Sequence, residues 1–306
     1  MRCLKSIYIR SVRTNSMTLE KPVKHVLGLS GGKDSAALAV YMRDHYPELE
    51  IEYFFTDTGK ELPEVMDYLN KLEAYLGKPI LRLGADKDFD YWLKEYNHFL
   101  PSGHQRWCTV QMKLVPFEKW VKPFLDEGYE IISYVGIRAD EPWREGYVPT
   151  QKFLTTKMPF AEDGLVKEDI INILEGTGLG LPKYYEWRSR SGCTFCFYQR
   201  KIEWVRLMER HPDKFEEAKA YEKQINDEKS TNGETYYWMG KNNPLSTLED
   251  PVRVAQIKAD HEKKLERFKK KRRRNALHDD QLIEMIDLDA LYDDMEGGGA
   301  CVTCYK

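Results

Sequence analysis

The chain has 306 residues, a mass of 36.0 kDa and a formal net charge of −3. Hydrophobic residues make up 42% of it and aromatic residues 12%, which excludes a wholly disordered protein. No apolar run approaches the roughly 20 residues that span a bilayer, and this excludes a membrane-spanning helix. The near-neutral total conceals a basic segment at 258–274 and an acidic segment at 279–296.

Short apolar runs alternate with helical patterns over the first 140 residues. Residues 25–29 predict a strand that ends in Ser-Gly-Gly, and 34–46 predict a helix ended by Pro47. A second predicted strand and a second predicted helix follow between residue 51 and Gly77. We expect further strands at 79–83 and 130–140, and further helices near 113–126 and 167–178. This alternation predicts an α/β fold, a parallel sheet sandwiched by helices.

The strand signal fades after about residue 141. Residues 199–228 and 251–274 read as helices, so we expect a mostly helical C-terminal region. The basic N-terminus lacks the apolar core of a secretory signal, and Met17 is a candidate start. We therefore expect a cytoplasmic protein without a membrane partner. The expected layout is a flexible leader at 1–24, an α/β domain with a cysteine site at 25–200, a helical region at 201–296 and a flexible Gly/Cys tail at 297–306.

The loop between the first strand and helix reads Ser30-Gly31-Gly32-Lys33-Asp34-Ser35. Two glycines permit a tight turn whose N–H groups converge, and the helix N-terminus adds its dipole, so the loop suits a phosphate. Lys33 would neutralise a departing pyrophosphate, and Asp34 would hold a Mg²⁺ ion. The spacing is not that of a Walker A loop. An ordinary glycine-rich turn is the alternative. The catalytic candidates are Lys33, Asp34 and Ser35, and Ser30, Gly31 and Gly32 join them as nucleotide-binding candidates.

The string S-G-G-K-D-S after a strand resembles the PP-loop of the ATP pyrophosphatases, also called the adenine nucleotide alpha hydrolase group. Two further segments, F-T-D-T-G-K-E at 55–61 and G-I-R-A-D-E-P-W-R at 136–144, resemble the phosphoadenosine phosphosulfate reductase-like branch. The resemblance covers roughly residues 25–200. It implies a Rossmann-like fold, the binding of ATP with Mg²⁺, and cleavage of ATP between the α- and β-phosphates.

The two segments add Asp57, Thr58, Gly136 and Arg138 to the expected ATP site. Asp57 and Thr58 lie where one predicted strand ends and Arg138 lies at the end of another, the place where parallel sheets bind their ligands. Ribose hydroxyls or a magnesium-bound water suit Asp57 and Thr58, and phosphate suits Arg138. For Arg144, an ion pair with Asp140 or Glu141 is as good an interpretation as substrate contact, and Glu61 could be a first-turn helix acid.

Six cysteines in a chain without an export signal favour metal or redox chemistry over disulfides. Cys193 and Cys196 form a C-x-x-C pair, and Cys108 is a distant third. Such a set can hold a metal or an iron–sulfur cluster, here expected as 4Fe–4S, or relay sulfur. Buried reduced thiols are the alternative. Cys301 and Cys304 follow a glycine run and could supply a further ligand, a sulfur relay or only a loose tail. No catalytic role is expected for His104.

Sulfonucleotide reductases carry a C-terminal E-C-G-[IL]-H segment, and their cluster-containing form has an adjacent cysteine pair. This sequence has neither. It resembles instead the ATP pyrophosphatases of DNA phosphorothioation, the DndC and SspD type of defence protein. The resemblance implies adenylylation of a DNA phosphate oxygen, sulfur from a cysteine desulfurase, and other phosphorothioation subunits as partners. The open alternatives are a sulfonucleotide reductase with its cysteine at 301 or 304, a tRNA thiolase, and a non-catalytic nucleotide-binding scaffold.

A basic stripe could bind the phosphates of DNA, with Tyr236, Tyr237 and Trp238 offering stacking surfaces. The alternative is a solvated helix paired with the acidic segment at 279–296. Tyr184, Tyr185 and Trp187 are expected in the core. The stripe consists of Lys263, Lys264, Arg267, Lys269, Lys270, Lys271, Arg272, Arg273 and Arg274.

Overall fold

The computed structural model describes residues 21–84, 86–144, 146, 148–229, 237–240 and 243–275, without the side chains of 224–229, 268 and 271–275. Its centre is a five-stranded sheet in which all neighbouring strands run parallel, in the order β3-β2-β1-β4-β5. The predicted α/β class is therefore confirmed. The strands are β1 (Val23–Gly28), β2 (Ile51–Thr56), β3 (Ile80–Leu83), β4 (Glu130–Tyr134) and β5 (Leu154–Lys157).

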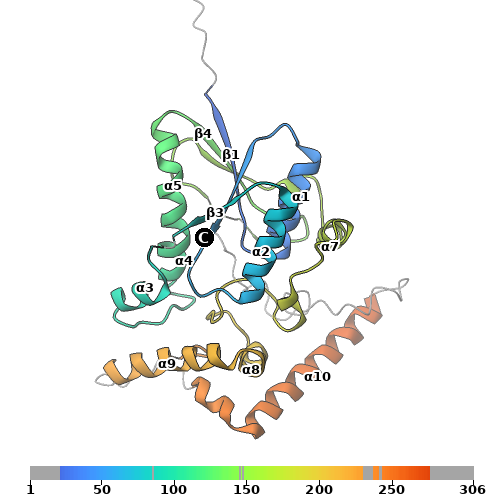
Figure 1. The fold of residues 1–306 in the computed structure, drawn as a ribbon. Coiled ribbons are helices and arrows are strands. Elements are labelled where there is room, and N and C mark those ends of the chain that lie inside the picture. The colour runs from blue at the N-terminus through green and yellow to red at the C-terminus, as the bar shows by residue number, and fades with distance from the viewer. Residues whose placement is uncertain are drawn as a thin grey trace, which may run out of the picture.

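Helices cover both faces of the sheet (Figure 1). Successive side chains of a strand point to opposite faces, so Leu27 packs in one hydrophobic cluster and Val26 in another. The first cluster lies against α1 (Lys33–His45), α2 (Pro63–Leu76) and α7 (Lys167–Gly176), and the second against α5 (Val115–Asp126).

Shorter elements connect the sheet to its surroundings. Helix α2 starts with Pro63 in its first turn and ends at Gly77, whose positive φ of 65° confirms the predicted stop. The shorter elements are α3 (Phe89–Glu95), α4 (Trp107–Thr109), a π-helical turn (Val110–Leu114), α6 (Pro159–Glu162) and 3-10 turns at Lys183–Glu186 and Leu245–Glu249.

The C-terminal helices α8 (Lys201–Arg210), α9 (Pro212–Lys229) and α10 (Pro251–Asn275) lie together at one end of the sheet (Figure 1). The prediction of one helical stretch at 199–228 was wrong in one respect. It is two helices, because Pro212 cannot donate the backbone hydrogen bond that would continue α8. Buried aromatic residues of α8 and α9, such as Trp204 and Phe215, belong to the same hydrophobic cluster as the sheet residue Leu27.

Three further expectations differ from the structure. The predicted strand at 130–140 ends at Tyr134, strand β5 was missed, and so was α3. Strand β5 lies at the edge of the sheet and buries only Leu154 among its four residues, which leaves almost no apolar pattern to detect. The boundaries expected at 24, 200 and 296 stay predictions. Among the described helices, none combines the length and the apolar character that crossing a membrane requires.

Candidate active site

The glycine loop lies at the carboxyl end of β1, the strand at which the sheet order reverses. The chain builds β2 and β3 on one side of β1 and β4 and β5 on the other. In open parallel sheets, ligands bind at the carboxyl ends of the strands where this reversal occurs. The loop from Ser30 to Gly32 occupies that position and leads directly into α1.

Two contacts determine the shape of the loop. Gly31 has a φ of 70°, and a Cβ there would lie 2.6 Å from Cγ1 of Val65, so a side chain is excluded by both backbone and space. The N–H of Ser30 donates to the Oγ of Ser35 at 3.1 Å, which closes the loop onto the first turn of α1. Tyr184 is buried, as expected, and its hydroxyl donates to the carbonyl oxygen of Gly31 at 2.8 Å.

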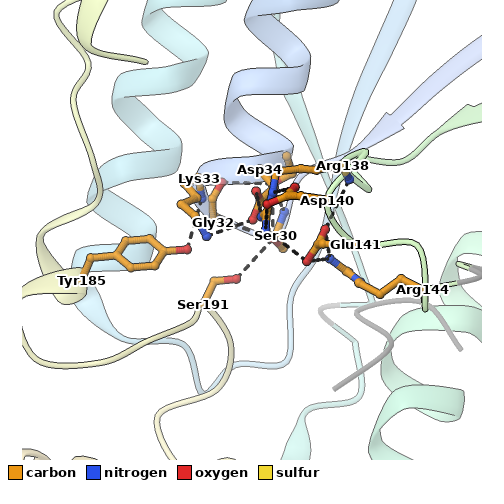
Figure 2. A network of polar contacts seen from close by, with 12 residues as sticks. Ser30, Gly32, Lys33, Asp34, Arg138, Asp140, Glu141, Arg144, Tyr185 and Ser191 are labelled. Carbon is orange, nitrogen blue, oxygen red and sulfur yellow. Dashed lines mark hydrogen bonds and ion pairs between the residues drawn. The ribbon is translucent and has the colours of Figure 1, made fainter. Parts of the chain in front are cut away.

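Lys33, Asp34 and Arg138 form a charged group above the loop (Figure 2). One carboxylate oxygen of Asp34 lies 3.2 Å from the Lys33 ammonium, and the other lies 2.8 Å from the Arg138 guanidinium. Although burial opposes ionisation, Lys33 and Arg138 hold the pKa of Asp34 well below its usual range. Asp34 is thus ionised, and both of its oxygens contact protein cations.

The segment at 136–144 brings Arg138 to the glycine loop. Gly136 approaches α1 so closely that a Cβ would lie 2.9 Å from the carbonyl oxygen of Asp34. Arg138 is 4% exposed and also pairs with Asp140 at 2.8 Å. Arg144 donates to both oxygens of Glu141 at 2.9 Å, so the ion-pair interpretation of Arg144 is confirmed (Figure 2).

The segment at 55–61 forms a turn at the end of β2. Asp57 accepts the N–H of Gly59 at 2.8 Å, and the Thr58 hydroxyl donates to Glu61 at 2.7 Å. Glu61 precedes α2, so its interpretation as a first-turn helix acid was wrong. Burial, together with the nearby charge of Asp57, raises the pKa of Glu61 to about 7 in spite of the bond from Thr58.

The structure brings the three expected cysteines within electrostatic reach of one another, and Cys193 lies next to this turn. Cys193 is 3.3 Å from the Thr58 hydroxyl and pairs through its backbone with Glu61. Burial raises the pKa of both Cys108 and Cys193 to about 12, and the charge of Cys196 adds to the rise in each case. All three are free thiols. Cys301 and Cys304 lie outside the described residues.

The glycine loop and residues 191–196, which carry the C-x-x-C pair and which we call the cysteine turn, contact each other through Ser30 and Ser191. The Ser191 hydroxyl is 3.3 Å from that of Ser30 (Figure 2). A small pocket of about 10 Å³ between them is lined by Ser30 from the loop, Glu61 from the second segment, Gly192 from the cysteine turn, and Lys113. Residues more than 160 positions apart thus form one site.

The donor atoms decide which residues suit a metal. Mg²⁺ takes oxygen ligands and is often bound by one or two carboxylates plus phosphates. Each oxygen of Asp34 already contacts a cation, Lys33 or Arg138, and its expected role as a Mg²⁺ ligand stays a prediction. Asp57 and Glu61 are better placed to bind Mg²⁺. Their carboxyl groups adjoin, and the charge of Asp57 disfavours the ionisation of Glu61, a repulsion that a bound cation would relieve.

The cysteine set offers thiols but no finished single-ion site. Within the described part of the chain, no three His, Cys, Asp or Glu side chains are placed to hold one metal ion. Cys108 and the C-x-x-C pair nevertheless supply thiols, the ligand type of an iron–sulfur cluster, whose iron charge would offset the cost of ionising buried thiols.

Several residues at the site were not identified from sequence. Tyr185, expected in the core, is half-buried, and its hydroxyl accepts the Lys33 N–H at 3.4 Å. Arg188 is 1% exposed and donates to the carbonyl oxygen of Cys193 at 2.7 Å. Only their closeness in sequence to the C-x-x-C pair could have indicated these residues. His104 is exposed.

Comparison with known proteins agrees with this geometry. Residues 24–160 match the family model of the phosphoadenosine phosphosulfate reductase domain. The uncharacterized protein MJ0066 of Methanocaldococcus jannaschii is 33% identical over 125 residues, 40% of this chain and 24% of that protein. An uncharacterized 37.8 kDa protein of Escherichia phage 186 is 24% identical over 66% of this chain and 75% of its own length.

Solved structures show weaker likeness. The phosphoadenylyl-sulfate reductase of Candida auris, in complex with phosphate, has a TM-score of 0.44 at 11% identity, over 56% of this chain and 81% of that one. The U34-tRNA thiolase NcsA of Methanococcus maripaludis, with its [4Fe-4S] cluster, has a TM-score of 0.40 at 16% identity, over 68% and 74%. These similarities identify no shared function. The matched residues 24–160 include the glycine loop and both further segments, so this part of the chain is similar to the phosphoadenosine phosphosulfate reductase domain.

Proposed function

We propose that this protein is an ATP pyrophosphatase that activates an acceptor oxygen by adenylylation, so that sulfur can replace it. The observation that carries the proposal is the direct contact between the nucleotide loop and the cysteine turn, made by Ser30 and Ser191. An ATP site that served only for binding would not need three thiols beside it. Adenylylation and sulfur delivery both require their reactants at one place.

The charges suit cleavage next to the α-phosphorus. The acceptor oxygen attacks that phosphorus, and pyrophosphate leaves with the bonding electrons. Lys33 and the N–H groups at the start of α1 neutralise the leaving pyrophosphate. Arg138, already held by Asp34, orients the phosphates. Mg²⁺ bound by Asp57 and Glu61 would supply additional positive charge to the phosphate oxygens.

The second half-reaction takes place at the cysteines. A sulfur nucleophile attacks the activated centre, and AMP leaves with the oxygen that was adenylylated. One of Cys108, Cys193 and Cys196 would carry the sulfur as a persulfide, and a second of these thiols would break the S–S bond after the attack and form a disulfide with the first. Alternatively, the three thiols would hold a 4Fe–4S cluster, which would supply a site for binding sulfide. Arg188, bonded to the Cys193 carbonyl, positions this turn.

The proposed acceptor is a backbone phosphate oxygen of DNA, with a cysteine desulfurase as sulfur donor and other phosphorothioation subunits as partners. The DndC- and SspD-like combination of PP-loop and cysteines supports this choice. Of the basic stripe, Lys263, Lys264 and Arg267 are exposed and line one large groove. Cys301 and Cys304, candidates for the catalytic cysteine of a reductase, lie outside the described residues.

Pyrophosphate release from ATP tests the first half of the proposal. Lys33→Met keeps the buried stem of the side chain and removes its charge, so release should fall by about 100-fold or more. Lys71→Met, at an exposed position of α2, is the matched control and should retain full activity. A wild-type protein that binds ATP and releases no pyrophosphate, with acceptor and sulfur donor present, would contradict the proposal.

The acceptor is identified by following the sulfur. Nuclease digestion and mass spectrometry of DNA and tRNA, from cells with and without the gene, should show gene-dependent phosphorothioate linkages in DNA. Loss of a thiolated base from tRNA would assign the thiolase alternative instead. Sulfite release from an adenylyl sulfate would assign the reductase.

A further inference from the structure

A second, much larger cavity lies between α10, the start of α8 and the turn that follows the C-x-x-C pair. Its volume is about 810 Å³, at the upper end of the range for small-molecule sites. It is lined by residues 197–202, 237–240 and 101–103, and by the side of α10 that carries Arg253 and His261. We call it the α10 groove.

The α10 groove is strongly basic. Six of its lining residues are cations and one, Asp260, is an anion. Lys263, Lys264 and Arg267 are exposed, and within the described part of the chain none of them has a carboxylate in ion-pair distance. Lys258, by contrast, is paired with Glu209. Three rim charges are thus available for an anionic ligand. The cations are Arg200, Lys201, Arg253, Lys263, Lys264 and Arg267.

Aromatic side chains line the same groove. Phe197, Tyr198 and Tyr237 are half-buried, and the rings of Phe197 and Tyr198 lie 4.3 Å apart. Trp238 also lines the groove but is only 4% exposed, and its indole N–H donates to the Ala218 carbonyl. Of the expected stacking residues, Trp238 is therefore a buried packing residue, Tyr236 lies outside the described residues, and Tyr237 faces the groove.

Gln199 supplies an independent sign that the groove takes a polar ligand. Its side chain lines the groove and is 7% exposed, and among the described residues its amide nitrogen has no hydrogen-bond partner. A buried amide donor without a partner costs free energy, which a ligand acceptor such as a phosphate or base oxygen would recover.

The groove is continuous with the cysteine site. The amide oxygen of Gln199 accepts the Cys196 N–H at 3.4 Å, and the Gln199 N–H donates to the Cys196 carbonyl at 2.8 Å. The guanidinium of Arg190 lies 5.8 Å from the ring of Tyr198, and that of Arg106 lies 5.4 Å from it. A ligand in the groove would lie beside the turn that carries Cys196.

We infer that the α10 groove binds an unpaired segment of a nucleic-acid strand, with bases stacked on its aromatic side chains and phosphates on its cationic rim. Stacking on aromatic residues inside a basic channel is how unpaired strands are bound without sequence preference. A sulfonucleotide alone would leave most of six cations and 810 Å³ unused. Calling this strand the sulfur acceptor rests on the proposed function, but strand binding itself does not.

Fluorescence anisotropy of the full-length protein with a labelled single-stranded DNA of about 12 nucleotides tests the inference. Combined Lys263→Glu, Lys264→Glu and Arg267→Glu should weaken binding at least tenfold and flatten its dependence on salt between about 50 and 200 mM. The control with the same charge change is Lys71→Glu, Lys119→Glu and Lys122→Glu on α2 and α5, all exposed, which should weaken binding less than twofold.

A second variant tests stacking without any change of charge. Tyr198→Leu should weaken strand binding about fivefold or more, since stacking on an aromatic ring is worth about 1–3 kcal/mol per base. Equal weakening by the control triple variant, preference for a duplex over the single strand, or no strand binding by the wild type would each overturn the inference. An RNA strand of the same sequence tells which nucleic acid is preferred.

Two readouts separate this inference from the proposed function. Lys33→Met should bind the strand as tightly as the wild type, because Lys33 is in the nucleotide loop. The groove triple variant should bind an ATP analogue normally. Strand binding without any pyrophosphate release would support the groove inference and contradict the proposed function. Pyrophosphate release without strand binding would support the proposed function and contradict the groove inference.

Discussion

Arg138, the buried cation of the candidate site, is held in place by three carboxylates, those of Asp34, Asp140 and Glu141. Arg138 contacts all three carboxylates, at 2.8 Å for Asp34 and Asp140 and 3.5 Å for Glu141. A buried guanidinium requires such partners, because burying a charge without compensation is costly. The carboxylates therefore fix a cation where phosphate oxygens are expected, and less reorganisation remains for binding.

Glu61 makes the stability of the protein depend on pH. Its pKa is raised from 4.5 to about 7 in the folded state, so folded protein holds the proton more tightly than unfolded protein. Its contribution is complete below pH 4.5 and is lost as the pH rises to about 7. Glu61→Gln should remove about 3 kcal/mol of this pH dependence. Urea unfolding at pH 4.5 and at pH 7 measures the free energy of unfolding of both proteins. An equal change in that free energy between the two pH values for the variant and the wild type would contradict the prediction.

Single residues of the site were predictable to different degrees. Lys33, Asp34, Asp57 and Arg138 follow strands in recognisable strings, and the structure brings them to one edge of the sheet. Tyr184 and Arg188 belong to no string, and their polar contacts arise only because the chain returns to the loop after residue 180. The sequence cannot indicate such long-range contacts by local pattern.

At the scale of elements, the alternation of apolar runs was sufficient to predict the order β1-α1-β2-α2-β3 and the position of β4. It was insufficient for β5, which buries one side chain, and for α3, which has only seven residues. Short elements carry too few periods to be distinguished from loops.

The close approach of Gly136 to α1 leads to a prediction about the packing of this helix. Gly136→Ala would place a Cβ 2.9 Å from the Asp34 carbonyl oxygen and 3.0 Å from its carbon, and neither backbone atom can move without shifting α1. We expect a loss of about 2 kcal/mol of stability and weaker binding of an ATP analogue.

Gly176→Ala is the matched control, because a Cβ there meets no atom within 4 Å. Thermal unfolding and nucleotide titration of both variants check the prediction. Unchanged nucleotide affinity in Gly136→Ala would show that the loop tolerates the displacement.

At the scale of the whole molecule, an aromatic cluster joins the sheet domain to the C-terminal helices. Phe195 lies between the two cysteines of the C-x-x-C pair, is 2% exposed, and has the rings of Phe89, Tyr221 and Trp238 within 5.5 Å. These neighbours come from α3, α9 and the segment at 237–240. The cysteine turn is therefore packed from three directions.

Phe195→Ala should lower the free energy of unfolding by about 3–5 kcal/mol, since it leaves a cavity at this junction. Circular dichroism and tryptophan fluorescence should still report one coincident transition, because the cluster is continuous with the sheet core. Tyr91→Ala, at a 39% exposed position of α3, is the control and should have little effect. Two separate transitions in the wild type would show that the regions unfold independently.

The bond from the Tyr184 hydroxyl to Gly31 also bears on how the protein is made. During synthesis, β1, the glycine loop and α1 leave the ribosome long before residues 184–191, which complete the loop from the other side. A nascent chain therefore carries the glycine loop without these two contacts, and the complete loop forms only when residues 184–191 have also emerged.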